Sequence, residues 1–453
     1  MINQALVIAA IALIYTSNGF YRALQASLGF AIIGYVATDY IIPRCINLFI
    51  AKGFTGKDLS KKGKPIIPET MGVIPAVIYL FLMFWFIPFL FYKYLVTGTN
   101  GGGNRLNGVE ELKDLSVELF PHEKLASYLS AFLTLESTII LGIADDLLDI
   151  KWRHKFFIPA IAAIPMLIVY YVDFGVTHVL IPTKLLQSYF GQSLIQLGPL
   201  YYGYMGAVAI FAPNSINILA GVNGLETSQS VVIGSLLLLN DCVYFFSSPH
   251  DSPAIESHLF SAALLIPYLG VSLALTKYNW YPSRVFVGDT FCYFSGMVFA
   301  VVGILGHFSK TLLVFLIPQI FNFIYSVPQL AGIVPCPRHR MPRFNEEDGL
   351  MYPSMASFEE KPLGSTPSLI LRVLSKLKLV YIIEKDGKII QVNNLTLINL
   401  TLVWFGPLRE DKLCATIITM QAFIGLVALS LRHMLGFWLF GYDNLFKAAS
   451  ITV

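Results

Sequence analysis

Long apolar stretches separated by short polar loops dominate the pattern of this chain. A helix that crosses a bilayer needs about 20 mostly apolar residues. Ten stretches come near that length: 27–50, 71–92, 125–144, 156–172, 197–217, 227–247, 257–276, 290–306, 309–334 and 411–432. The opening run 5–15 is shorter, and we expect an uncleaved, partly ordered lead-in there, with a signal-like segment, an interfacial helix or an eleventh span as alternatives. The pattern predicts an all-α polytopic membrane protein with about ten transmembrane helices.

The composition agrees with this membrane assignment. The chain is 55% hydrophobic and 13% charged, whereas soluble domains carry about 25% charged residues, and its mean hydropathy is +0.65. A net charge of +3 gives no reason to expect a nucleic-acid partner. The five cysteines form no CxxC pair, so we expect neither a zinc site nor a disulfide framework.

The charges of the loops predict an orientation. Basic residues gather in three loops that ten spans would place on one side of the membrane: 51–70, 145–155 and 334–343. Loops rich in Lys and Arg stay in the cytosol during insertion. We therefore expect these three loops on the cytosolic face.

One polar segment, 335–395, interrupts the apolar pattern. It contains "VYIIEKDGKIIQV", in which β-branched residues flank Asp386 and Gly387, a strong signal for a two-residue β-hairpin turn. We expect a transmembrane bundle with catalytic cytosolic loops at 1–334, a small cytosolic insertion containing this hairpin at 335–395, and an amphipathic segment with the last transmembrane helix at 396–453.

The stretch "LGIADDLLDIKWRHK" places charges at the end of an apolar segment. Asp145, Asp146 and Asp149 follow the span, and a basic cluster ending at Lys155 comes next. Carboxylates at a lipid boundary are costly unless they bind something cationic, and Mg²⁺ prefers carboxylate and water oxygens. A solvated helix end is the alternative interpretation.

Three further polar stretches follow apolar spans: "NSINILAGVNGLE" (214–226), "NWYPSRVFVGDTF" (279–291) and "PCPRHRMPR" (335–343). The first suits a re-entrant backbone that lines a polar cavity, and the arginines of the third fit phosphate oxygens. Each alone could be a polar turn, an interfacial packing element or a topogenic charge cluster. Together they place acids, amides and arginines on one face, which a magnesium–diphosphate site requires.

These four stretches, in order and with matching spacing, resemble the signature stretches of eukaryotic members of the polyprenyl-phosphate N-acetylhexosamine-1-phosphate transferase superfamily, from about residue 27 to 435. The resemblance implies transfer of GlcNAc-1-phosphate from UDP-GlcNAc to dolichyl phosphate, giving GlcNAc-diphosphodolichol and UMP, the first step of N-glycan precursor assembly. It also implies Mg²⁺ as cofactor, inhibition by tunicamycin, and residence in the endoplasmic reticulum membrane with the active site facing the cytosol. The expected partners are UDP-GlcNAc, dolichyl phosphate and the lipid bilayer, with a homodimer as a candidate assembly.

The resemblance also assigns roles residue by residue. It implies catalytic roles for Asp145, Asp146 and Lys155, and metal ligation by Asn217 and Asp289. The implied UDP-GlcNAc contacts are Lys57, Asp58, Leu59, Glu69, Asn223, Phe286, Arg338, His339 and Arg340. The implied lipid-phosphate contacts are Lys155, Ile210, Phe211, Ala212, Pro213, Asn214, Ser215, Ile216, Asn217 and Ile218.

Two alternatives to this function remain at the sequence level. One is a transferase of the same superfamily with another sugar specificity. The other is a secondary transporter with Glu136 as a proton relay, although the acids cluster at one face rather than at the midplane and no internal repeat is visible. For the transfer itself, both a direct displacement and a covalent intermediate on Asp145 or Asp146 stay open.

Overall fold

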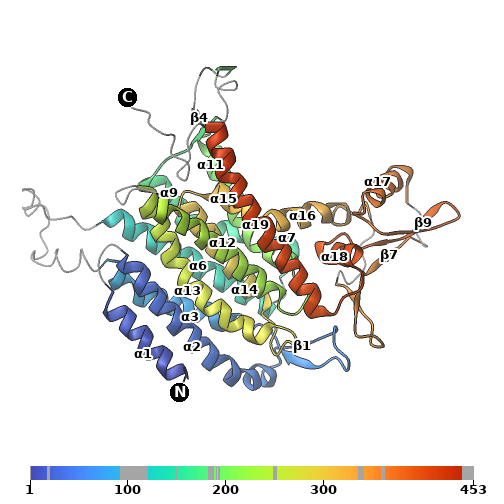
Figure 1. Ribbon diagram of the computed structural model, residues 1–453, viewed down its shortest axis with the longest axis horizontal. Helices are drawn as coiled ribbons and strands as arrows, with labels where there is room; N and C mark the ends of the chain where they lie inside the picture. The colour runs from blue at the N-terminus through green and yellow to red at the C-terminus, as the bar shows by residue number, and fades with distance from the viewer. Residues whose placement is uncertain are drawn as a thin grey trace, which may run out of the picture.

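The computed structural model describes residues 2–17, 21–91, 121–148, 150–181, 188–189, 191, 194–247, 253–334, 341–358 and 363–440. Within them, seven helices are long and apolar enough to cross a membrane, and a pair bent by 69° makes up to eight. The seven are α2 (Arg22–Ala51), α3 (Val73–Leu90), α6 (His122–Leu148), α12 (Leu225–Ser247), α13 (Pro253–Asn279), α14 (Gly288–Leu305) and α19 (Glu410–Phe440). The bent pair is α15 (Ser309–Phe315) and α16 (Ile317–Leu330). The prediction of a polytopic helical membrane protein is confirmed (Figure 1).

Two of the ten expected spans take a different form. The segment 156–172 is broken into α8 (Ile158–Ala162) and α9 (Ile164–Asp173), each with a proline in its first turn, because proline starts a helix well but cannot continue one. The segment 197–217 becomes α11 (Pro199–Ile218), which has 20 residues but ends in a polar turn. The lead-in forms α1 (Ile2–Tyr15), which packs on α2.

Helix α14 lies at the centre of the bundle, packed between α6, α11 and α13 (Figure 1). Every residue from Thr290 to Leu305 is buried. Two glycines let neighbouring backbones touch this helix: a Cβ on Gly296 would lie 2.3 Å from the Cα of Pro213 in α11, and a Cβ on Gly142 of α6 would lie 2.6 Å from the Cα of Thr290. Small residues at helix contacts are the usual way for membrane helices to pack closely. The first turn of α14 is therefore held against the ends of α6 and α11.

A chain of buried glutamines joins three helices at the broken end of α11. Gln319 of α16 donates to Gln229 of α12 at 3.0 Å and to Gln421 of α19 at 2.8 Å. Gln229 in turn donates to the carbonyl oxygens of Ile216 and Leu219, and Gln421 donates to a carbonyl at the bend between α15 and α16. Carbonyls left free by a helix end must find donors inside a membrane protein. These amides thus stabilise the two helix breaks.

The polar segment forms a small α/β insertion that projects from one side of the bundle (Figure 1). Its elements are β5 (Arg343–Phe344), β6 (Met351–Tyr352), β7 (Met355–Ser357), α17 (Ser365–Lys376), β8 (Ile382–Lys385) and β9 (Lys388–Asn393), followed by α18 (Leu397–Phe405). Strands β7, β9 and β8 form an antiparallel sheet in that order. The turn residues Asp386 and Gly387 have φ of 51° and 73°, as a two-residue hairpin turn requires. The predicted hairpin is confirmed.

Two short antiparallel pairs and a single helical turn complete the described elements: β1 (Thr55–Lys57) with β2 (Ile66–Pro68), β3 (His178–Leu180) with β4 (Leu194–Gln196), and α7 (Trp152–Lys155). The β1–β2 pair and α7 carry residues expected in the site.

The Gly296 contact gives a test of this packing. We expect Gly296→Ala to destabilise the protein by about 1–3 kcal/mol, the usual cost of overpacking, because its Cβ would overlap the backbone of α11. Thermal unfolding in detergent measures this. Gly203→Ala is the matched control, since Gly203 lies in α11 with open space around it. Equal melting temperatures for the two variants would contradict the close contact.

Candidate active site

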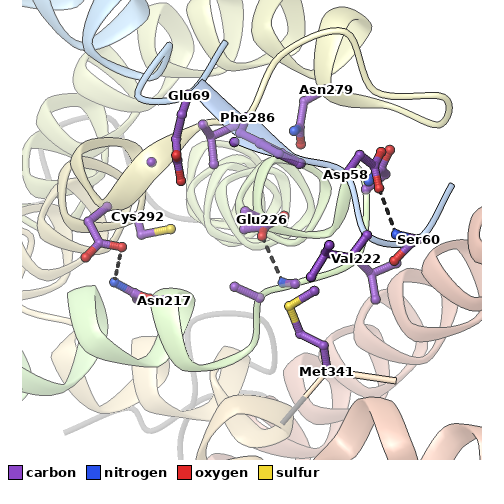
Figure 2. A pocket seen from close by; sticks show the side chains of 18 of the residues that line it. Asp58, Ser60, Glu69, Asn217, Val222, Glu226, Asn279, Phe286, Cys292 and Met341 are labelled. Atoms are coloured by element: carbon purple, nitrogen blue, oxygen red, sulfur yellow. Dashed lines mark hydrogen bonds between the residues drawn. The ribbon is translucent and has the colours of Figure 1, made fainter. Parts of the chain in front are cut away.

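A cavity of about 500 Å³ opens where the β1–β2 loop meets the ends of α11, α12 and α14, a size typical of small-molecule sites. Figure 2 shows Glu69 and Phe286 on one side of it and Met341 on the other. Eight residues expected from the sequence line it: Lys57, Asp58, Leu59, Glu69, Asn217, Asn223, Phe286 and Asp289. These eight residues and Met341 come from four stretches that are far apart in the chain.

One cluster of charges lies at the inner wall of the cavity and beside it. Asp289 accepts a hydrogen bond from Asn217 Nδ2 at 2.8 Å and another from Lys155 Nζ at 2.7 Å. Lys155 Nζ also lies 2.9 Å from Asp145 Oδ2. Burial acts to lower the pKa of Lys155, but its bonds to Asp289 and Asp145 raise it above the ordinary lysine value. Lys155 is therefore charged at neutral pH and can attract an anion beside Asp289.

The donor set fits a hard divalent cation. Asp289 and Asn217 supply carboxylate and amide oxygens, which are the ligands Mg²⁺ prefers. Within the described residues, no group of three or more His, Cys, Asp or Glu side chains could hold a metal by itself. Mg²⁺ commonly takes only one or two protein carboxylates and completes its shell with water and substrate phosphates, so this sparse set suits it.

Asp146 has a different environment from Asp145. Its carboxylate accepts the backbone N–H of Asp289 at 2.7 Å, the N–H of Thr290 at 3.2 Å and the Thr290 hydroxyl at 2.5 Å. It thus caps the N-terminus of α14 from the neighbouring helix, where a negative charge is favourable. A Cβ at Gly288, whose φ is 73°, would lie 2.7 Å from Asp146. These contacts make Asp146 a positioning residue for Asp289, and the catalytic role expected from the sequence stays a prediction.

The β1–β2 loop is joined to the segment before α14 by backbone hydrogen bonds. The N–H of Phe286 donates to Pro68 O at 2.8 Å, and the N–H of Met71 donates to Phe286 O at 3.1 Å. The Phe286 ring lies so close to Gly56 that a Cβ there would be 2.9 Å from it. Desolvation, followed by the charges of Asp146 and Asp289, raises the pKa of Glu69. The carboxylates thus form one repulsive cluster that favours a cation.

Three residues of the site were not expected from the sequence. Lys61 forms an ion pair with Glu410, lies 3.3 Å from Asp58 and donates to Asn223 Oδ1 at 3.2 Å. Glu410 also accepts the N–H of Asn223 at 2.8 Å. Lys61 is one of several lysines in its loop, and Glu410 resembles any acid in the first turn of a helix, so no local pattern identified them. A third residue, Glu226, accepts the N–H of Gly221 and holds the turn before α12.

The expected lipid-phosphate segment, 210–218, forms the last turns of α11. Most of its side chains are buried, and Asn214 donates to the carbonyls of Phe156 and Ile210. Only Ile210, Phe211, Asn217 and Ile218 are partly exposed. The segment therefore borders the charged cluster chiefly through its end, and its contact with lipid phosphate stays a prediction.

Some expected residues lie outside the described residues, namely Arg338, His339, Arg340 and Asp149. Met341, which follows the arginine loop directly, lines the cavity. A Cβ on Gly221 would lie 3.0 Å from Met341 Cγ. The chain therefore returns to the cavity immediately after that loop. Glu136, half-buried in α6, does not line it.

The capping contact of Asp146 gives a test that separates positioning from catalysis. Asp146→Asn should lower the free energy of unfolding by about 1–3 kcal/mol, because a charged acceptor of three hydrogen bonds is lost. Thr290→Val, which removes only the hydroxyl bond, should cost about 1 kcal/mol. Thermal unfolding of both variants measures the difference. If Asp146→Asn unfolds like the wild type and yet loses turnover, Asp146 acts on the substrate directly.

Comparison with known proteins shows the family of this chain. The profile described as Glycosyl transferase family 4 matches residues 128–307. The chain is 59% identical to the UDP-N-acetylglucosamine–dolichyl-phosphate N-acetylglucosaminephosphotransferase of Saccharomyces cerevisiae, over 95% of this chain and 96% of that protein. It is 50% identical to the Schizosaccharomyces pombe protein of the same name, over 93% and 94%, and 38% identical to the one from Dictyostelium discoideum, over 93% and 92%. With this identity along nearly its whole length, and with an acid–amide–lysine cluster at its cavity, the chain belongs to the family of UDP-N-acetylglucosamine–dolichyl-phosphate N-acetylglucosaminephosphotransferases.

Proposed function

We propose that this protein transfers GlcNAc-1-phosphate from UDP-GlcNAc to dolichyl phosphate, with GlcNAc-diphosphodolichol and UMP as products. The observation that carries the proposal is the joining of Lys155, Asp289, Asn217 and Asp145 beside a cavity of about 500 Å³. The substrates are those in the names of the full-length relatives. A cavity of this size can hold a nucleotide sugar.

The chemistry favours a direct displacement. The second pKa of a phosphate monoester is about 6, so the lipid phosphate is already a nucleophile at neutral pH. One of its oxygens bonds to the sugar-linked phosphorus as the bond from that phosphorus to UMP breaks. The main barrier is repulsion between two anions. The ammonium group of Lys155 lies between Asp145 and Asp289. It is therefore placed beside the proposed metal ligand, where it can hold the attacking phosphate.

Asp289 and Asn217 are the residues that would hold Mg²⁺, which, when bound, neutralises charge on the diphosphate. The capping bonds to Asp146 keep Asp289 in the wall of the cavity. A preorganised carboxylate spends no free energy on reorientation during the reaction. The role of these residues in metal binding thus follows from donor chemistry and placement.

The residues around the charged cluster favour the direct route over a covalent one. Both oxygens of Asp146 accept hydrogen bonds from the start of α14, so it cannot attack phosphorus without releasing that helix. Asp145 is ion-paired with Lys155 and accepts the N–H of Ile150 at 3.1 Å. A carboxylate held by two donors is a weak nucleophile. We therefore assign Asp145 to orienting Lys155.

The other residues of the cavity bind the nucleotide. Phe286 offers an aromatic face for uracil, and Asp58, Leu59 and Asn223 surround the same space. Arg338, His339 and Arg340 would grip the sugar and the diphosphate from the loop that ends at Met341. Lys57, although exposed, stands at the rim, where it can attract a nucleotide.

The basic residues at the site indicate the side of the membrane on which the reaction takes place. The β1–β2 loop, which carries several lysines, lines the cavity, and Lys155 of the basic α7 donates to Asp289 in the cavity wall, so the loop and α7 lie on one side of the membrane. The positive-inside rule makes that side cytosolic. We propose a multi-pass protein of the endoplasmic reticulum with its active site facing the cytosol. A homodimer stays a candidate assembly, which a mass measurement in detergent would test.

The proposed reaction has a direct assay. Purified protein should transfer radiolabel from UDP-GlcNAc into a lipid that partitions into organic solvent, in a Mg²⁺-dependent way. Asp289→Ala should abolish transfer or shift the Mg²⁺ requirement to far higher concentration. Lys52→Ala, an exposed change outside the cavity, should leave both unchanged. An unaltered Mg²⁺ titration for Asp289→Ala would place the metal elsewhere, and transport of UDP-GlcNAc without transfer would favour the transporter alternative.

The division of the site between its two substrates can be measured separately. Loss of one charge-assisted hydrogen bond costs about 1.5–3 kcal/mol, or on the order of ten- to a hundredfold in affinity. Arg340→Ala should therefore raise KM for UDP-GlcNAc and leave KM for dolichyl phosphate near the wild-type value. Lys155→Ala should give the opposite pattern. If both variants impair both substrates equally, the two halves of the site are not separate.

A further inference from the structure

Helix α17 of the insertion carries an apolar face that no other described residue covers. Leu371, on its inner side, is only 2% exposed and packs in a core with residues of β7, β8 and β9. Leu369 and Leu377, on another side, are 64% and 63% exposed, and Ile370 and Val373 between them are half exposed. Their spacing places Leu369, Ile370 and Val373 on one face of the helix, and Leu377, the residue directly after the helix, extends that face. We call Leu369, Ile370, Val373 and Leu377 the outer face of α17.

Basic residues flank this outer face. Lys376 and Lys378 are exposed beside Leu377, and Arg372 is held by Glu384 at 2.8 Å and by the carbonyl of Gly387. An apolar face bordered by Lys and Arg is typical of helices that lie in the plane of a membrane surface. The same face in water would be a costly apolar patch.

Exposed apolar side chains also occur on α16, the helix of the bundle to which the backbone after α17 is attached. Three of these side chains lie on α16, the C-terminal helix of the bent pair, and a fourth lies three residues past its end: Ile324, Val327, Leu330 and Ile333. The backbone just after α17 is fixed to the bundle at two points, because Tyr325 of α16 donates to Leu379 O at 2.5 Å and Trp404 of α18 donates to Lys378 O at 2.8 Å. Figure 1 shows α17 beyond the end of α16. The C-terminal end of α17 is therefore tied to a bent helix pair that is apolar enough to cross a membrane.

Exposed aromatic residues lie at the same junction. Trp404 and Tyr381 are about half exposed, and Phe405 beside Trp404 is more so. Trp and Tyr are enriched where proteins meet the boundary between lipid headgroups and acyl chains. Trp404 donates to Lys378 O, directly after Leu377. Aromatic residues beside an apolar face are typical of that boundary.

We propose that the outer face of α17 inserts into the lipid leaflet on the cavity side of the membrane, so that the insertion rests on the bilayer instead of standing free in solvent. The occupant of this surface is phospholipid, with acyl chains against the leucines and headgroups near Lys376 and Lys378. This inference does not depend on which sugar nucleotide the cavity takes.

The experiment uses the full-length protein in lipid nanodiscs. Cys45, Cys242 and Cys336 are replaced by alanine, which leaves the buried Cys292 and Cys414. A bimane fluorophore is attached to Val373→Cys on the outer face or, as matched control, to Lys385→Cys at the exposed end of β8. Two quenchers are compared, a phosphatidylcholine brominated on its acyl chains and aqueous iodide. Melting temperatures of both labelled proteins should match that of the unlabelled protein.

We expect the brominated lipid to quench the fluorophore at 373 several-fold more strongly than the one at 385, and iodide to show the reverse order. Quenching of 373 by iodide, with no effect of brominated lipid, would overturn the proposal. Protection of 373 from both quenchers would also overturn it, because a second copy or another protein would then cover the face. Neither quenching measurement depends on enzyme activity. A failure of the proposed lipid contact is therefore distinguishable from a failure of the proposed transfer reaction.

Discussion

The site depends on the close contact of backbones around the first turns of α14. Gly142 and Gly296 carry no side chain where α6 and α11 touch this helix, and Asp146 caps its start. Inside a bilayer, helix association gains little from the hydrophobic effect and relies on packing and hydrogen bonds. These contacts bring the end of α6, the end of α11 and the start of α14 to one point. Asp145, Asn217 and Asp289 meet because these three helix ends meet.

Such an arrangement concentrates negative charge, and the chain compensates for it locally. Three aspartates lie in or beside the first turn of α14, and Glu69 adds a fourth carboxyl whose pKa is raised by burial and by the charges of Asp146 and Asp289. Lys155 neutralises part of this charge through two short contacts, since an unpaired buried charge would be prohibitive. The residual excess of carboxylates favours a divalent cation. The carboxylates that repel one another in the free site therefore favour the binding of a metal ion together with two phosphates.

The sequence predicted most of the fold because a membrane leaves few choices. Long apolar runs must be helical, and the Asp386–Gly387 turn required a hairpin. The two spans that differ contain prolines, as in α8 and α9, or polar end residues, as in α11, whose effect depends on neighbours such as Gln229. In the site, the acids at the end of α6 stood out because carboxylates at a lipid boundary are costly, whereas the roles of Asn217, Asp289 and Lys155 were implied by the family resemblance. The capping role of Asp146 and the ion pair of Lys61 with Glu410 were not, because they join segments that only the fold brings together.

Glu410 shows why the last helix belongs to the site as much as the earlier ones. It lies at the start of α19, after the whole insertion, and yet it binds Lys61 of the first loop and the backbone of Asn223. The insertion must therefore return the chain to the place where α19 can begin beside the cavity. Hydrogen bonds from α16 hold that return, with Asn322 accepting the N–H of Leu397 and Gln329 accepting that of Leu395. Phe344 of β5 and Leu413 of α19 belong to one core with Val222, which lines the cavity, so the chain that enters the insertion and the chain that leaves it are held by the same side chains.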